Sequence, residues 1–107
     1  MKSRLRAFVE DHPEGWNHED WVGLLAELEA GGADVGDAAK VGRALEKTRL
    51  EWELDRRAVK GLGPKRSQAL VAHFETIWSL RQASVDDVAG VPTITRGLAE
   101  KVVQAIQ

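Results

Sequence analysis

Two segments of the chain, 32 positions apart, each combine a tight turn with the start of a helix. The first segment is residues 59–70, VKGLGPKRSQAL, and the second is residues 91–102, VPTITRGLAEKV. Backbone N–H groups at such a helix start have no partner inside the helix, and the helix dipole adds positive potential there. The two segments therefore predict anion sites, and phosphate is the usual anion at such a site.

The first segment has the residue types that a phosphate site needs. Gly61 and Gly63 permit positive φ and let a phosphate oxygen approach the backbone without meeting a Cβ atom. Lys60, Lys65 and Arg66 place positive charge close to the turn, and such side chains recognise charge and not bases. The predicted binding residues of this segment are Lys60, Gly61, Leu62, Gly63, Lys65 and Arg66.

The second segment keeps the pattern but has lost both glycines. Thr95 suits the position because threonine caps helices well and its hydroxyl can donate to phosphate. Thr93 is a β-branched residue, which is disfavoured at positive φ, so a different turn is expected here. Arg96 is the cation nearest to this turn. Thr93, Thr95 and Arg96 are predicted to form a second and weaker site.

The two segments resemble the helix-hairpin-helix motif. Residues 59–106, a little under half of the chain, resemble the tandem helix-hairpin-helix region at the C-terminus of bacterial excinuclease C. The matching phrases are Gly61-Leu62-Gly63-Pro64-Lys65-Arg66, Ala69-Leu70, His73-Phe74, Ala83-Ser84-Val85, Val91-Pro92 and Leu98-Ala99-Glu100. The resemblance implies a domain that straddles a DNA minor groove. Each hairpin would hold phosphates of one strand, often with a preference for junctions or unpaired regions.

The segments on either side of these turns are all predicted to be helices. No sustained alternation of apolar and polar residues indicates a strand. Helices are expected at 4–10, from the Asn17 cap to Gly31, from Asp34 or Asp37 to about 58, at 64–74, at 76–82, from the Ser84 cap to Gly90, and from the Thr95 cap to 106. The predicted fold is an all-α, compact domain of about six helices with a C-terminal tandem helix-hairpin-helix.

Two regions are predicted within this one domain. Residues 1–58 form an N-terminal helical region of unknown role, whose last helix continues into the hairpin domain. Residues 59–107 form the DNA-binding tandem. Among the four tryptophans, Trp21 and Trp52 lie on apolar helical faces and are expected in the core, and Trp78 is expected to seal the space between the hairpins.

The distribution of charge along the chain supports the same division into an N-terminal and a C-terminal region. The net charge is −2, yet residues 56–107 carry eight Lys or Arg against four Asp or Glu. Residues 1–55 carry seven against thirteen, so the positive balance that phosphate attracts lies in the C-terminal half. The chain has no cysteine and no run of the roughly 20 apolar residues that a membrane span needs. A cytoplasmic protein with no membrane partner is expected.

Two functions fit these residues. The first is non-sequence-specific DNA binding, duplex or junction, by an accessory factor in repair or processing. The second is a protein-interaction module, in which the acidic N-terminal helices bind a partner protein and the hairpins only build the fold. Catalysis is not expected, because no nucleophile is paired with a base. His12, His18, Glu19 and Asp20 match no metal-ligand spacing and fit a capped helix start better, so neither a metal nor another cofactor is expected.

Overall fold

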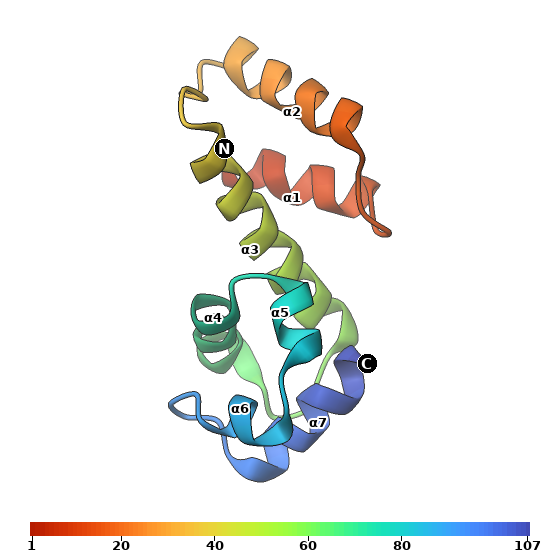
Figure 1. Ribbon diagram of the computed structural model, residues 1–107, viewed down its shortest axis with the longest axis vertical. Helices are drawn as coiled ribbons and strands as arrows, with labels where there is room; N and C mark the ends of the chain where they lie inside the picture. Colours follow the sequence, from red (N-terminus) through yellow and green to blue (C-terminus); the bar gives the residue numbers. More distant parts are fainter.

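The computed structural model describes residues 1–107 as an elongated bundle of helices without strands, 45 × 23 × 21 Å. The helices are α1 (Lys2–Asp11), α2 (His18–Ala30), α3 (Ala38–Arg57), α4 (Gly63–Phe74), α5 (Ile77–Gln82), α6 (Val85–Ala89) and α7 (Arg96–Ile106). Figure 1 shows α1 and α2 at one end, α4 to α7 at the other, and the long α3 running between them. The predicted all-α fold is confirmed. It has seven helices, one for each of the expected ranges, including the two short helices of the spacer between the repeats.

Helix starts follow the capping residues that the sequence predicted. The Asn17 side chain accepts from the Asp20 N–H at 2.8 Å, and the Asp20 carboxylate accepts from the Asn17 N–H at 3.2 Å. Ser84 and Asp87 form the same reciprocal pair at the start of α6. Each pair satisfies two N–H groups that the helix leaves free, which is why these helices begin there.

Two hydrophobic cores lie along α3. The smaller core joins α1 and α2 to the first half of α3 and contains Leu5, Val9, Leu24, Leu28, Val41 and Leu45. The larger core contains Leu50 and Leu54 of α3 together with the buried residues of α4 to α7. The two cores meet on α3 between Leu45 and Leu50, so this helix is shared by both ends of the molecule.

Residues at equivalent positions of the two repeats are buried in or beside the larger core. Leu62 and Ile94, the apolar residues of the two turns, are 4% and 6% exposed. Ser67 and Ala99, one turn into the following helices, are also buried, and so are Leu70 and Val102 further along. Because these positions recur at the same spacing, both turns are anchored to one core.

The tryptophans divide into half-buried and exposed residues. Trp21 and Trp52 pack against the smaller core as half-buried residues, so they lie at its edge and not inside it as expected. Trp78 is 68% exposed, so the prediction that it seals the space between the hairpins is wrong. The inward face of α5 is occupied by its neighbours Ile77 and Leu80, which turns Trp78 toward solvent.

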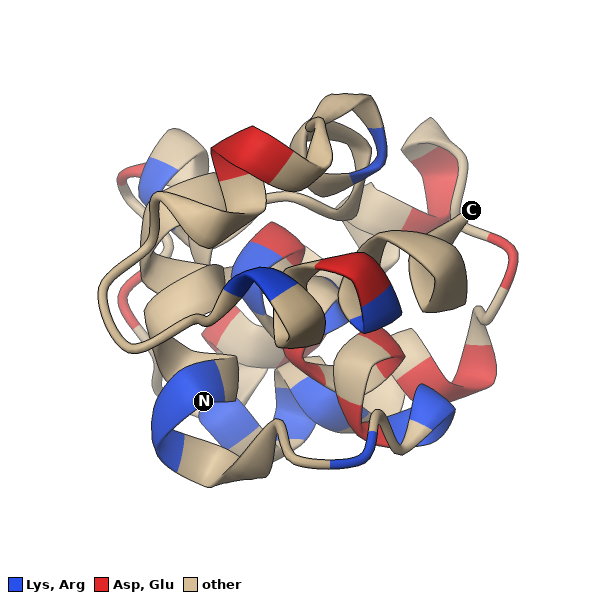
Figure 2. Cartoon of the chain, turned by 90° about the horizontal axis from the view of Figure 1, so that it is seen from below, with Lys and Arg blue, Asp and Glu red and all other residues tan.

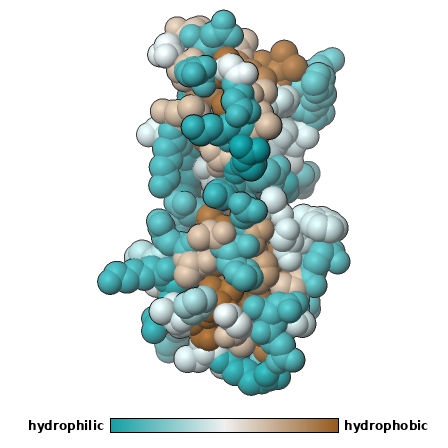
Figure 3. Space-filling model, turned by 60° about the vertical axis from the view of Figure 1, so that its left-hand side comes forward, coloured by the Kyte–Doolittle hydropathy of each residue, from teal (hydrophilic) through white to brown (hydrophobic).

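The outer surface is mostly hydrophilic. Figure 3 shows hydrophilic residues over most of one face of the molecule, with apolar residues visible at its upper end and along the middle of its lower half. None of the helices is both long enough and apolar enough to cross a membrane.

Candidate phosphate-binding site

The two turns share one backbone arrangement. In the first, the Leu62 N–H donates to the Val59 carbonyl at 3.2 Å; in the second, the Ile94 N–H donates to the Val91 carbonyl at 3.1 Å. Leu62, which the sequence placed among the binding residues, points into the core and holds its turn from inside. The repeat seen in the sequence is therefore a repeat of main-chain hydrogen bonding.

Thr93 corrects one expectation. Its φ is 73°, close to the 89° of the equivalent Gly61, so the second turn keeps the left-handed conformation of the first. A left-handed non-glycine residue costs roughly 1–2 kcal/mol. The conformation persists because Val91 and Ile94 are buried on either side and fix the turn around Thr93.

The two turns do differ at the next equivalent position. Gly63 has a φ of 64° and is the first residue of α4. Thr95 has a φ of −77° and stands before α7, where its hydroxyl accepts from the Leu98 N–H at 3.2 Å. The predicted cap at Thr95 is therefore confirmed, and the loss of glycine here is accommodated by a different entry into the helix.

Backbone N–H groups are free at both turns. In the first turn, the exposed N–H groups of Gly61, Gly63 and Lys65 donate to no group within the protein. The exposed N–H groups of Thr93, Thr95 and Gly97 are free at the second turn. Each set lies at a helix start, where the dipole favours an anion.

A shallow cleft of about 320 Å³ lies between the first turn and the start of α7. Its lining includes Lys60 and Arg66 from the first repeat together with Thr95 and Lys101 from the second, and no acidic residue. Lys101 was missed from the sequence. The signal that could have found it is its position four residues after Gly97, which places it on the helix face that includes the free N–H groups.

Arg66 connects the two turns directly. Its Nε donates to the Thr93 carbonyl at 3.1 Å, and its Nη1 donates to the Gly61 carbonyl at 3.4 Å. These two carbonyls belong to the equivalent left-handed residues of the two repeats. The guanidinium therefore spans the gap between the turns while it adds positive charge to the cleft.

The other cations near the turns differ in whether they form ion pairs. Arg96 pairs with Asp86 at 2.6 Å and with Glu100 at 3.9 Å, and the hydrogen bond to Asp86 raises the pKa of Arg96 above its ordinary value. Lys60 and Lys65 form no ion pair. Lys101 of α7 also forms no ion pair, so the uncompensated charge lies beside the first turn and in the cleft.

Positive and negative residues are interspersed and do not separate onto two faces of the molecule. Figure 2, which looks along the long axis from the hairpin end, shows Lys and Arg interspersed with Asp and Glu. The cleft between the turns has three cations and no acidic residue in its lining. That arrangement focuses positive potential at the place where the free N–H groups lie.

Known proteins share the hairpin half of the chain. A family model described as "SAM-like Helix-hairpin-helix tandem" matches residues 53–107. The UvrABC system protein C of Symbiobacterium thermophilum is 52% identical over 48 residues, which are 45% of this chain and 8% of that protein. The protein of the same name from Vibrio parahaemolyticus is 37% identical over 75 residues, 70% of this chain and 11% of that protein.

The chain thus spans about a tenth of the length of these curated relatives. No solved structure matches it. The family model covers just over half of the chain and includes both turns and the helices that follow them. This chain belongs to the SAM-like helix-hairpin-helix tandem family.

Proposed function

We propose that this protein binds DNA through the phosphate backbone and without sequence specificity. The observation that carries the proposal is the repeated turn, which presents free backbone N–H groups twice from one core. A main-chain N–H group is the same whatever base lies nearby, so contacts of this kind position DNA without reading its sequence.

The first hairpin is the main contact in this proposal. Gly61, Gly63 and Lys65 supply N–H donors to phosphate, and the side chains of Lys60 and Lys65 add charge. Thr93, Thr95 and Gly97 supply the donors of the second hairpin, with Lys101 in the cleft between the two. Arg96 contributes less, because Asp86 already offsets its charge.

The biological setting proposed is DNA repair or processing, in an accessory and non-catalytic role. The support is the likeness of this chain, over 48 to 75 residues, to the relatives named UvrABC system protein C. The chain covers only a small part of those proteins, so the proposed role is DNA attachment and includes no reaction step.

A salt titration with paired variants tests the proposal. The affinity for a labelled duplex and for a forked DNA is measured at several salt concentrations by fluorescence anisotropy. Each phosphate neutralised by a cation contributes about 0.9 to the slope of log K against log salt. We expect Lys60→Ala with Lys65→Ala to weaken binding and to reduce that slope by roughly 1.8.

The matched control is Lys2→Ala with Lys40→Ala, which removes the same charge from exposed residues of α1 and α3. It should leave the slope close to that of the unmodified protein. If neither DNA binds at low salt, or if both lysine pairs change the slope equally, the proposed binding surface is wrong.

A further inference from the structure

A second pocket, of about 430 Å³, lies where α3 and α4 meet, and Gly63 of the first turn is among its lining residues. Its volume lies within the range of known ligand sites. Apolar side chains from Leu54, Leu62 and Pro64 contribute to its lining. It shares no lining residue with the cationic cleft, so its occupant need not be the ligand of the hairpins.

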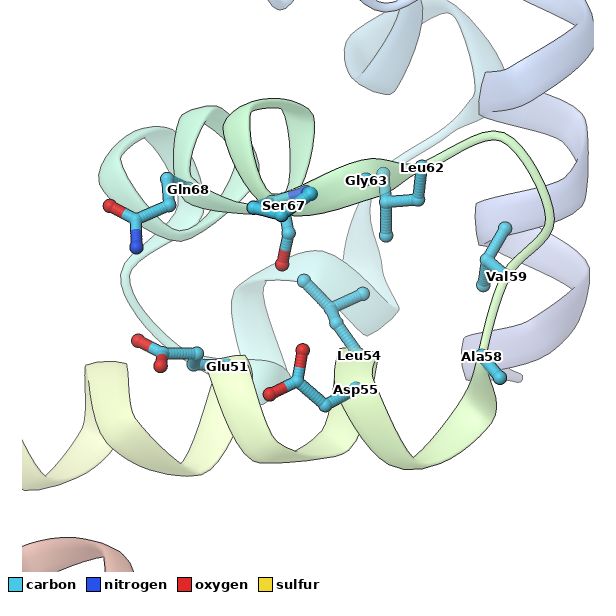
Figure 4. Close-up of a pocket in the computed structure, with 10 residues that line it drawn as sticks. Glu51, Leu54, Asp55, Ala58, Val59, Leu62, Gly63, Ser67 and Gln68 are labelled. Carbon is cyan, nitrogen blue, oxygen red and sulfur yellow. The ribbon is translucent and has the colours of Figure 1, made fainter.

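Two carboxylates give this pocket an acidic wall. Glu51 and Asp55 lie one turn apart on α3, and Figure 4 shows both among the side chains around the space between α3 and α4. Arg6 of α1 approaches both, at 3.8 Å from Glu51 and 3.3 Å from Asp55, but it also pairs with Glu10 at 3.0 Å. One guanidinium shared among three carboxylates leaves the cluster with a net negative charge.

A buried hydroxyl in the pocket lacks a partner. Ser67 is 7% exposed, and its Oγ forms no hydrogen bond within the protein. Figure 4 shows that this hydroxyl points from α4 toward α3, into the space beside Asp55. An unsatisfied buried polar atom costs about 1–3 kcal/mol, and it needs an explanation where it occurs. A polar group of a bound ligand would satisfy it.

We propose that the α3–α4 pocket binds the cationic end of a lysine or arginine side chain from a basic segment of a partner protein. The two carboxylates neutralise the cation, and the Ser67 hydroxyl accepts a hydrogen bond from one of its N–H groups. The apolar wall covers the methylene stem, as it does where long basic side chains lie on protein surfaces. Charge complementarity therefore selects a basic peptide as the occupant.

Other occupants fit the pocket less well. Two carboxylates are too few for a calcium site, which takes six to eight oxygen ligands. Nucleic acid would place phosphate beside Glu51 and Asp55, where like charges repel. The pocket shares no lining residue with the cationic cleft, and Gly63 is the only N–H donor of the proposed DNA site that also lines the pocket.

The test is a titration of the full-length 15N-labelled protein, followed by 1H–15N correlation spectra. The probes are two capped tripeptides, Gly-Lys-Gly and Gly-Arg-Gly, and an uncharged Gly-norleucine-Gly peptide of similar shape. We expect saturable shifts of the amide signals of residues 51, 55, 67 and 68 with the cationic peptides. Shifts with the norleucine peptide should need a concentration roughly tenfold higher, a difference of about 1.4 kcal/mol.

Variants locate the binding site. Glu51→Gln with Asp55→Asn should weaken the cationic peptides roughly tenfold. The control Glu14→Gln with Glu29→Gln removes the same charge from exposed residues outside the pocket and should leave the affinity unchanged. Ser67→Ala, which removes an unpaired hydroxyl and should fold normally, is expected to weaken binding several-fold.

Three outcomes would overturn the proposal: no saturable shift, equal binding of the norleucine peptide, or equal weakening by the two acidic pairs. The DNA titration is a separate measurement, and the lysines that it changes, Lys60 and Lys65, lie outside the pocket lining. Failure of the peptide to bind therefore leaves the DNA proposal standing, and failure of DNA to bind leaves this one standing.

Discussion

The Arg66 side chain faces the protein and not only the solvent, because its guanidinium donates to the carbonyls of Gly61 and Thr93. The planar fork of arginine can donate to two acceptors at once, whereas lysine presents a compact point charge. Among single residues, Arg66 therefore bridges the two turns, which the larger core already anchors.

Arg66 should affect DNA affinity through this bridge between the turns. Arg66→Met is expected to weaken binding while the slope of log K against log salt stays unchanged, because no phosphate contact is lost. Arg66→Lys should fail to restore the affinity, since it keeps the charge but not the two-acceptor geometry. Anisotropy titrations at several salt concentrations measure both quantities. A slope lower by about 0.9 in the methionine variant, restored by lysine, would instead place Arg66 on a phosphate.

Single residues also show what a sequence can predict. The glycines at 61 and 63 and the cap at Thr95 are local signals, and the structure has them as predicted. The left-handed Thr93 was not predictable from its own preference, because burial of its neighbours overrides that preference. The acceptor of Arg66 lies 27 positions away in the chain, so only the fold reveals it.

At the scale of elements, α6 depends on its capping pair. The Ser84 backbone N–H donates to the Asp87 carboxylate at 3.0 Å, and the Ser84 hydroxyl accepts from the Asp87 backbone N–H at 3.1 Å. Hydrogen bonding by Ser84, first of all from its backbone N–H, holds the pKa of the Asp87 carboxyl below its ordinary value. This helix packs with α7, whose first turn belongs to the second hairpin. Loss of the cap would therefore loosen the support of that hairpin.

A lowered folded-state pKa has a definite consequence for stability against pH. The contribution of Asp87 is fully present above its unfolded pKa of about 3.9, and it is lost as pH falls through the lower folded pKa. Asp87→Asn should lack this contribution. The free energies of unfolding of the two proteins should therefore differ at pH 7 and approach each other as pH falls below about 4. Urea unfolding from pH 7 to pH 2 measures the difference. A difference that is constant over that range would show that the carboxylate does not stabilise the cap.

Helix positions were predictable because their start signals lie within a few residues, as at Asn17 and Ser84. The direction in which a side chain points from a short helix was not predictable. Trp78 is one residue from the buried Ile77, and the side of α5 that faces the core is decided by packing with neighbouring helices.

At the scale of the whole molecule, α3 holds two cores that share no buried residue. Val41 and Leu45 of this helix lie in one core and Leu50 and Leu54 in the other, and which elements pack on each pair depends on contacts distant in the chain. Because the hairpins rest on the larger core alone, damage to the smaller core should not reach them.

Leu24→Ala tests this separation. Leu24 is 2% exposed in the smaller core, so its truncation should destabilise that end by about 2–5 kcal/mol. DNA affinity measured well below the unfolding temperature should stay unchanged. Val22→Ala, at a position that is 48% exposed on the same helix, is the matched control and should have little effect on either quantity. A large loss of DNA affinity in Leu24→Ala would mean that the two ends are coupled.

The central claim is that DNA phosphates lie on the free N–H groups of the two turns. A 1H–15N titration of the protein with a short duplex at low salt observes those groups directly. We expect the largest shifts at Gly61, Gly63 and Lys65 and smaller shifts at Thr93, Thr95 and Gly97. Shifts confined to α1 and α2, or no shift at either turn, would contradict this claim.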